Sequence, residues 1–311
     1  MIHVENLTKY YGDLCAVDRI NLDVRKGEIL GILGPNGAGK TTTLRMLTGF
    51  IRPSSGTIRI KDYTIDAHSL EIRKLLGYLP ESAPLYHDML VFDYLSYVAD
   101  IREVEKGKKL SRIREMADLC GLNEVMHKPV AELSKGYKQR VGLAHAMIKD
   151  PEILVFDEPT SGLDPNQIIE IRDIMRNIGK EKTVVLSTHI LSEAEATCDR
   201  VVIIHQGKIA ADGTMESLKQ SASGDYSIHL CFRDAGMEDV QRELGTMAGI
   251  EGISIEEGEG AVLQVKLSCR SSDDLRSRLY EKIKQTDWVL LEFYQERQSL
   301  ENIFQKLTLE S

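Results

Sequence analysis

The feature that most constrains this chain is a glycine-rich segment that joins an apolar strand to a helix. Residues 28–34 form an apolar run of the kind found in buried strands. They lead directly into residues 34–41, which have the pattern G-x-x-x-x-G-K-[ST], and Leu44, Met46 and Leu47 then mark a helix. This order of strand, loop and helix predicts an α/β protein whose loop binds phosphate groups.

Each residue type in this loop suits a phosphate ligand. Glycine lets backbone N–H groups close around phosphate oxygens without a Cβ in the way, and the following helix directs the positive end of its dipole at the anion. Lys40 can reach the β- and γ-phosphates of a nucleotide, and the hydroxyl of Thr41 can ligate Mg²⁺. The loop therefore predicts a nucleotide site with a magnesium ion.

A second motif ends the apolar run at residues 153–156 with two adjacent carboxylates, Asp157 and Glu158. Ligands of parallel α/β sheets bind at the carboxyl ends of the strands, where these side chains are expected. Asp157 suits Mg²⁺, and Glu158 suits a base that accepts a proton from an attacking water. Alone, the motif would equally describe a strand that Pro159 ends. Combined with the phosphate loop, it predicts hydrolysis of the bound nucleotide.

A third strand at residues 183–187 is followed by Thr188 and His189. A single histidine after a strand is often only structural. At the end of another strand of the same sheet, however, it would lie near the γ-phosphate. We therefore interpret His189 as a catalytic candidate.

Composition excludes several other classes of protein. The 311 residues, 42% hydrophobic and 28% charged, are typical of a soluble globular chain of about two domains. The net charge of −9 argues against nucleic-acid binding, which needs a basic surface. We find no apolar run long enough to span a bilayer and no secretion signal. The five cysteines form no close pair, which predicts buried thiols in a reducing cytoplasm.

A polar stretch at residues 220–224 has the character of a linker, so we expect one domain over 1–217 and another over 218–311. The second part alternates strand-like and helix-like runs in the order β-α-β-β-α-β, which predicts a small ferredoxin-like α+β domain. A last helix is expected around residues 300–307. With 11 basic and 17 acidic residues this part does not suit RNA. A folding or dimer-stabilising accessory role and a ligand-sensing role both stay open.

Together the motifs resemble the nucleotide-binding subunit of an ABC transporter, over about residues 2–217. Several elements match in order: an aromatic residue that stacks on adenine, the Walker A loop, a Q-loop position, the signature motif, Walker B with its glutamate, the D-loop, and the switch histidine. In this chain they are Tyr11, residues 34–42 (Gly34, Pro35, Asn36, Gly37, Ala38, Gly39, Lys40, Thr41, Thr42), Glu81, residues 133–137, Asp157 with Glu158, residues 161–164, and His189.

The resemblance implies a mechanism that spacing alone does not show. Such domains hydrolyse ATP with Mg²⁺ as head-to-tail homodimers that hold two ATP molecules between them. The signature residues act on the nucleotide of the other subunit, the D-loop aspartate Asp164 lies close by, and residues about 82–145 form a helical subdomain. A separate polytopic permease is implied, with the ATPase attached to it on the cytoplasmic face of the membrane. The signature residues are Ser134, Lys135, Gly136 and Tyr137.

Two motifs depart from the family pattern, at three positions. The signature has Lys135 and Tyr137 where the family usually has glycine and glutamine, and Glu81 replaces the Q-loop glutamine. Lys135 can attract phosphate or point to solvent. Glu81 can ligate Mg²⁺ or face the permease, and we expect the metal role. With these departures the chain resembles bacterial gliding-motility and drug-export ATPases, so we expect an exporter.

Other ATPases with the same motifs are less consistent with the chain. Chromosome-maintenance ATPases have long coiled coils between Walker A and Walker B, but here only 117 positions separate Lys40 from Asp157. A regulatory or mechanical ABC ATPase without a permease stays open as the alternative.

Overall fold

The computed structural model describes residues 1–221, 225–258, 262–270 and 274–297. The chain divides into two compact units, Met1–Met215 and Glu216–Ser311. Helix α8 (Met215–Ser221) lies across this division and includes the first residues of the stretch that was predicted to be a linker. The predicted helix at residues 300–307 lies outside the described residues. In the described residues, no helix has the length and apolar character to cross a membrane.

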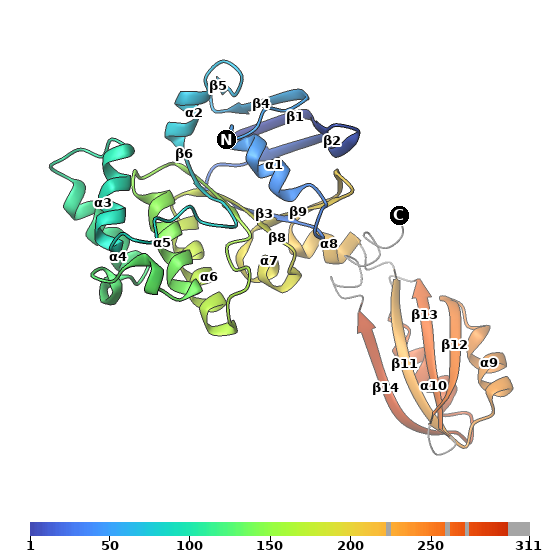
Figure 1. Cartoon of the computed structure of the whole chain (residues 1–311). Helices are drawn as coiled ribbons and strands as arrows, with labels where there is room; N and C mark the ends of the chain where they lie inside the picture. The colour runs from blue at the N-terminus through green and yellow to red at the C-terminus, as the bar shows by residue number, and fades with distance from the viewer. Residues whose placement is uncertain (222–224, 259–261, 271–273, 298–311) are drawn as a thin grey trace. The chain divides into compact units, whose positions relative to one another are not determined.

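A four-stranded antiparallel sheet opens the first unit (Figure 1). Its two long strands pair with each other along most of their length, with Lys9 opposite Val17 and Tyr11 opposite Leu14. Alternate residues such as Ile2, Val4 and Leu22 are buried on one face. In spatial order the strands are β2 (Leu14–Val24), β1 (Ile2–Tyr11), β4 (Ser55–Ile60) and β5 (Tyr63–Thr64).

The second sheet of this unit has six strands and carries the predicted motifs. All neighbours pair in parallel except β9 and β10. The three central strands are buried along their whole length, as expected for parallel strands covered on both faces. In spatial order the strands are β10 (Lys208–Gly213), β9 (Arg200–His205), β3 (Ile29–Leu33), β8 (Thr183–Thr188), β7 (Ile153–Asp157) and β6 (Leu76–Leu79).

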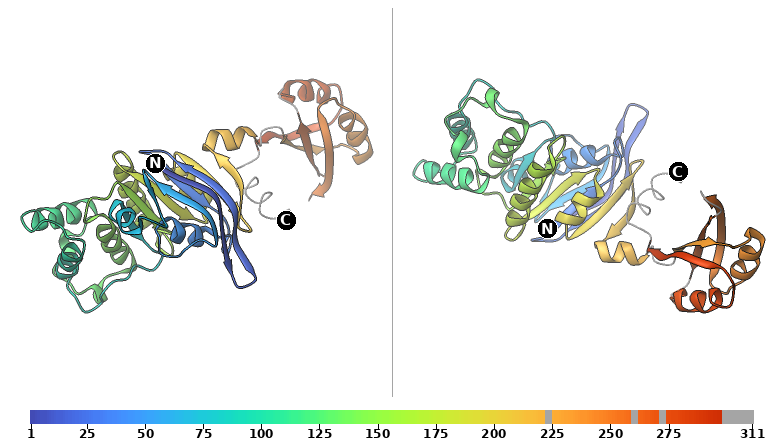
Figure 2. Two further views of the ribbon diagram at one scale, coloured as in Figure 1. Left: turned by 90° about the horizontal axis from the view of Figure 1, so that it is seen from above. Right: turned by 90° about the horizontal axis from the view of Figure 1, so that it is seen from below.

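Two hydrophobic cores hold these layers together. One lies between the two sheets and around α1, and the other lies between the six-stranded sheet and the helices α3 to α6. Figures 1 and 2 show α3 and α4 at the opposite end of this unit from β1 and β2. The helices are α1 (Lys40–Leu47), α2 (Ser69–Leu75), α3 (Val91–Ile101), α4 (Lys109–Leu119), α5 (Lys135–Met147), α6 (Pro165–Gly179) and α7 (Leu191–Thr197), with short 3-10 turns at Asn123–Val125 and Val130–Glu132.

The second unit has the predicted β-α-β-β-α-β order. All neighbouring strands of its sheet are antiparallel, in the spatial order β12, β13, β11, β14, which is the ferredoxin-like arrangement. Residues 226, 228, 230 and 232 share one core with both helices, so both helices cover the same face. The elements are β11 (Asp225–Arg233), α9 (Met237–Gly245), β12 (Ile250–Gly258), β13 (Val262–Arg270), α10 (Arg276–Ile283) and β14 (Val289–Arg297).

The cysteines were expected to be buried thiols. All five are free, but only Cys120 and Cys269 are buried, and the other three are partly exposed. The expectation was therefore wrong for Cys15 and Cys231, which lie on β2 and β11 at positions that only partly face a core. Cys198, between α7 and β9, is partly exposed as a residue, but its side chain packs against the core beside Gly31.

Candidate active site

The phosphate loop lies between β3 and α1 and has a backbone that glycine makes possible. Gly39, directly before α1, has φ 105°, in the left-handed region that side chains with a Cβ rarely adopt. A Cβ here would lie 2.5 Å from the carbonyl oxygen of Ala16, and a Cβ on Gly34 would lie 2.3 Å from that of Ile204. Both glycines therefore allow the loop to pack directly against neighbouring backbone.

Lys40, the first residue of α1, lies almost completely buried under this loop. Its Nζ donates hydrogen bonds to the carbonyl oxygens of Gly34, at 2.8 Å, and Pro35, at 3.2 Å. The same Nζ lies 3.2 Å from Glu158 Oε1. The loop thus holds a cation at its centre, which suits a polyanionic ligand.

Asp157 ends β7 with a side chain that has one satisfied oxygen and one free oxygen. Oδ1 accepts hydrogen bonds from Thr41, at 3.0 Å, and from Ser187, at 2.7 Å. Oδ2 is buried and has no hydrogen-bond partner. A buried, unpaired carboxylate oxygen beside a threonine hydroxyl is a donor set that fits Mg²⁺.

Glu158 follows Asp157 in an unusual conformation. Its φ of 48° is rare for a residue with a side chain, and such strain is concentrated at functional sites. Its N–H donates to the hydroxyl of Ser187 at 2.9 Å, which holds the strained backbone in place. His189 Nδ1 lies 2.7 Å from Glu158 Oε2, and since a carboxylate only accepts, this nitrogen carries the proton. Glu158 is thereby held between Lys40 and His189.

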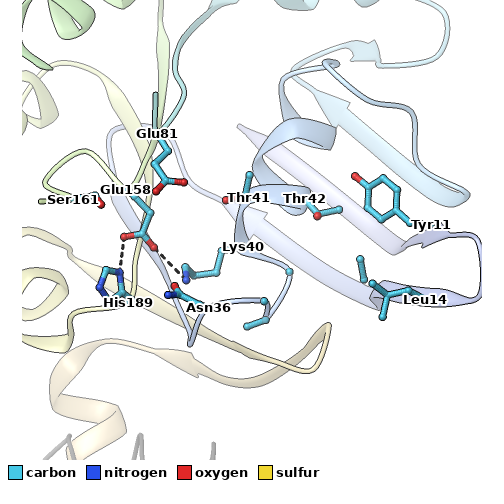
Figure 3. Close-up of a pocket in the computed structure, with 14 residues that line it drawn as sticks. Tyr11, Leu14, Asn36, Lys40, Thr41, Thr42, Glu81, Glu158, Ser161 and His189 are labelled. Atoms are coloured by element: carbon cyan, nitrogen blue, oxygen red, sulfur yellow. Dashed lines mark hydrogen bonds and ion pairs between the residues drawn. The ribbon is translucent and has the colours of Figure 1, made fainter. Parts of the chain in front are cut away.

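These side chains surround one pocket of about 550 Å³, within the usual size of ligand sites (Figure 3). It contains the predicted adenine-stacking Tyr11, a half-exposed tyrosine, and Glu81 from the Q-loop position. The lining residues are Tyr11, Leu14, Ala16, Asn36, Gly37, Ala38, Gly39, Lys40, Thr41, Thr42, Glu81, Glu158, Ser161 and His189.

The tyrosine of β6 next to this site stays protonated. Burial, and then the negative charge of Asp157, raise the pKa of Tyr78 to about 12. At neutral pH its hydroxyl is therefore uncharged and adds no negative charge beside the carboxylates.

The signature residues do not line this pocket. They lie at the start of α5, where the Ser134 hydroxyl caps the helix by accepting from the N–H of Tyr137 at 3.4 Å. Gly136 packs against Gln167 of α6, since a Cβ here would lie 2.6 Å from Gln167 Cδ. Asp164 caps α6 by accepting from the N–H groups of residues 166 and 167.

Lys135 lies against the D-loop of its own chain. A Cβ on Gly162, which has φ 67°, would lie 2.2 Å from Lys135 Nζ. From the sequence, Lys135 could attract phosphate or point to solvent. In the structure the side chain is exposed, and its Nζ lies beside Gly162.

Ser187 is the site residue that sequence reasoning missed. It joins Asp157 and Glu158 through one hydroxyl, because the parallel register places Ser187 directly opposite Asp157. The only signal in the sequence was its place at the end of the strand before Thr188 and His189.

Several known proteins are similar to this chain in sequence or in fold. The sequence model of the family described as ABC transporter matches residues 17–161. An uncharacterized ABC transporter ATP-binding protein, YxlF, of Bacillus subtilis is 41% identical over 71% of this chain and 73% of its own length. The bacitracin transport ATP-binding protein BcrA of Bacillus licheniformis is 40% identical over 71% and 72%.

Two further proteins are matched over a larger share of their own length. The linearmycin resistance ATP-binding protein LnrL of B. subtilis is 29% identical over 99% of this chain and 98% of its own length. A solved ATP-binding subunit of an ABC transporter is 30% identical, with a TM-score of 0.65 over 71% of this chain and 92% of that one. The chain therefore belongs to the ABC transporter family, as an ATP-binding subunit with ATPase activity.

Proposed function

We propose that the chain hydrolyses ATP in the pocket of Lys40, Glu158 and His189, and that a head-to-tail homodimer of it drives a separate membrane permease. One observation carries the proposal. Residues of the phosphate loop, Glu158 and His189 line one pocket, and Asp157 is hydrogen-bonded to its lining residue Thr41, whereas the signature residues of the same chain lie outside it. The site is therefore complete for binding phosphate but needs a second chain to bring a signature motif to it.

In this proposal, Lys40 and the loop amides hold the phosphates of ATP. Lys40 Nζ is already directed into the loop by two carbonyl oxygens, so little side-chain freedom is lost on binding. Tyr11 stacks on the adenine from the edge of the pocket. Residues 34–42 thus bind ATP, and Tyr11 contributes to the recognition of its base.

The Mg²⁺ ion fits the donor set of Thr41 and Asp157, because Asp157 Oδ2 is buried and unpaired. When bound, the ion neutralises charge on the phosphate oxygens. Glu81 lines the same pocket, and we propose that it senses the metal. Glu81→Ala should then change the Mg²⁺ dependence of ATP hydrolysis or the coupling to transport, and an unchanged variant would contradict this role.

Hydrolysis requires a base for the attacking water and control of its orientation. Glu158 is a nearly buried carboxylate at the pocket wall, and we assign it as the acceptor of the water proton. His189 donates Nδ1–H to Glu158 and orients the carboxylate. It also lines the pocket, where we propose that it contacts the γ-phosphate, as the sequence predicted.

The dimer places the start of α5 of one chain over the nucleotide of the other. Ser134, Gly136 and the amides at the start of this helix make a second anion-binding surface. The exposed Lys135 adds positive charge to that surface, and Tyr137 completes the motif. ATP would then lie between two chains, and its hydrolysis would weaken the dimer.

Transport is supported by the relatives and by the surface of the helical subdomain. The bacitracin and linearmycin relatives favour an exporter. The net charge of −9 argues against binding of nucleic acid, which needs a basic surface. Tyr86, Phe92 and Tyr97 are large exposed residues on and before α3, where a cytoplasmic segment of the permease would dock. The protein would then be peripheral to the cytoplasmic face of the membrane.

Glu158→Gln tests the proposal, because it keeps the shape of the side chain but removes the base. The variant should bind ATP, stop turnover and accumulate as an ATP-bound dimer, measured by phosphate release and light scattering. Normal turnover would overturn the catalytic assignment. Co-purification of the tagged protein with a polytopic membrane protein would support transport, and a Glu158→Gln dimer without such a partner would favour a regulatory or mechanical ATPase.

We further propose that residues 1–217 form the ATPase domain, with its helical subdomain at about 82–145, and that residues 218–311 form an accessory domain that stabilises the dimer. Removing residues 218–311 from the Glu158→Gln variant should then weaken its ATP-dependent dimer. Unchanged dimerisation would favour the ligand-sensing role instead.

A further inference from the structure

Glu193, in the first turn of α7, joins the two segments that carry the catalytic side chains. Its Oε2 accepts a hydrogen bond from the Thr160 hydroxyl at 2.6 Å and another from the Thr188 hydroxyl at 3.0 Å. Thr160 lies two residues after Glu158, and Thr188 directly precedes His189. One carboxylate oxygen thus connects the segment after β7 with the end of β8.

Both threonine hydroxyls use Glu193 as their hydrogen-bond acceptor, and water does not freely replace it because the two residues are buried. Thr160 is 5% exposed and Thr188 is 1% exposed. The Thr188 hydroxyl donates its proton to Glu193, which leaves its lone pairs for the N–H of Ile190 at 3.0 Å. Glu193 therefore fixes the backbone on both sides of His189.

The space behind these contacts is not tightly packed. Thr160, Arg172, Thr188 and Glu193 are among the residues that line a separate cavity of about 160 Å³. Glu193 Oε1 and Arg172 Nε are both buried without a hydrogen-bond partner. The hydrogen bonds to Glu193 therefore add to the β-sheet pairing and to the Ser187 contacts that hold the two segments in place.

A closed ring of contacts results around the catalytic pair. Ser187 joins β7 and β8 from one side, through Asp157 and the N–H of Glu158. Glu193 joins the segments that follow these strands from the other side. We propose that Glu193 is a positioning residue for hydrolysis that sets His189 relative to Glu158, an inference that rests on the function proposed above for these two residues.

Steady-state ATP hydrolysis by the full chain tests this role. Glu193→Ala should lower kcat by about 10- to 100-fold, because a misplacement of about 1 Å is enough for such a loss. The KM for ATP should stay near the wild-type value, since Glu193 does not line the nucleotide pocket. Glu193→Gln should retain most of kcat, because its amide oxygen can accept both hydrogen bonds. Glu195→Ala, at an exposed position of the same helix, is the matched control and should behave as the wild type.

A double-mutant cycle separates positioning from a general loss of stability. If Glu193 acts through His189, Glu193→Ala should lower kcat much less in a His189→Ala protein than in the wild type. Fully additive effects would overturn the proposal. A structural role alone would raise KM and lower the thermal stability together, so that combination would also overturn the proposal.

The experiment also distinguishes this inference from the proposed function. Normal turnover by Glu158→Gln would overturn the proposed function itself. An inactive Glu158→Gln protein together with wild-type kcat in Glu193→Ala would overturn only the role of Glu193. If Glu193→Ala does not fold, Thr160→Val removes one of the two hydrogen bonds at nearly constant volume, because the Thr160 hydroxyl bonds to Glu193. It must then lower kcat, and wild-type kcat in this variant would overturn the proposal.

Discussion

Two histidine–glutamate pairs of nearly the same geometry occur in the two units of the molecule. In the ATPase unit, His189 Nδ1 lies 2.7 Å from Glu158 Oε2. In the C-terminal unit, His229 Nε2 lies 2.6 Å from Glu296 Oε2, and the ring of Tyr294 stacks on the histidine at 5.0 Å. The contact alone would suggest the same chemistry in both places.

The surroundings of the two pairs differ in burial and in backbone strain, although each glutamate has a lysine nearby. Glu158 is nearly buried, has a strained backbone and faces Lys40 across a phosphate-binding pocket. The Glu296 side chain is 43% exposed on the face of the sheet that lies opposite the core, where Lys266 is 3.8 Å away. Burial and backbone strain are typical of functional sites and distinguish the first pair, whereas solvent screens the second.

The largest expected effect is a loss of stability confined to one unit, which tests whether the two units unfold independently. Phe232 is fully buried in the C-terminal core and packs edge-on against Trp288 at 5.3 Å. Phe232→Ala should lower the free energy of unfolding of this unit by about 4 kcal/mol. Calorimetry should show a lower transition temperature for this unit alone, while kcat for ATP hydrolysis stays unchanged.

Phe156→Ala is the matched change in the ATPase unit, because Phe156 is also fully buried and lies two residues before Glu158. It should lower the transition that ATP stabilises, since a ligand raises the stability only of the unit that binds it. If either substitution lowered both transitions equally, the two units would unfold as one and the comparison between them would fail.

The local features of the ATPase unit could be predicted from the sequence. The phosphate loop binds through consecutive residues whose backbone geometry glycine dictates, so residues 34–41 identify it without tertiary information. The fold of the C-terminal unit was also confirmed, because alternation along each strand and helical spacing are local patterns.

The residues that support the site could not be predicted in the same way. Ser187 contacts Asp157 across 30 residues of chain, and Glu193 contacts Thr160 across 33. Their roles depend on which strands are neighbours and on the register between them. Likewise, Lys135 rests on Gly162 because the turn there has no side chain in the way, which the sequence alone did not show.

His145 should make the stability of the ATPase unit depend on pH, without affecting the C-terminal unit. Burial, and then the charge of Arg102, lower the pKa of His145 to about 4 from an ordinary value of 6.5. Between these values the unfolded chain binds a proton that the folded chain does not. The free energy of unfolding should therefore fall as the pH falls from 6.5 to 4, by up to about 3 kcal/mol.

His145→Gln isolates this effect from carboxylates that titrate in the same range. Denaturant unfolding of the ATPase unit at pH 7 and pH 4.5 should show a smaller loss of stability for the variant than for the wild type. The substitution also changes the contact of His145 with the Tyr94 hydroxyl, 2.6 Å away, so Tyr94→Phe is the control for that contact. An equal pH dependence in wild type and His145→Gln would contradict the prediction.

The histidines of the two pairs test the comparison directly. His189→Ala should lower kcat about 100-fold, or about 2.7 kcal/mol in activation free energy, because the carboxylate of Glu158 loses the group that orients it. His229→Ala should leave kcat and the KM for ATP unchanged. Phosphate release at saturating ATP measures both. A similar loss of kcat in both variants would show that the geometry of the pair, rather than its surroundings, determines its function.

The smallest effect is expected for Glu296→Gln, the change that removes the charge of the C-terminal pair. Exposed ion pairs contribute less than about 1 kcal/mol, since the two charges are screened and the side chains lose freedom when they pair. The unfolding transition of this unit should therefore hardly move, and kcat should stay at the wild-type value, whereas Glu158→Gln stops turnover. A clear fall in kcat without a loss of stability would instead mean that the open face of this sheet acts on the ATPase unit. The weak pair would then be a regulatory contact, and its exposure would reflect access for a ligand or partner rather than the lack of a role.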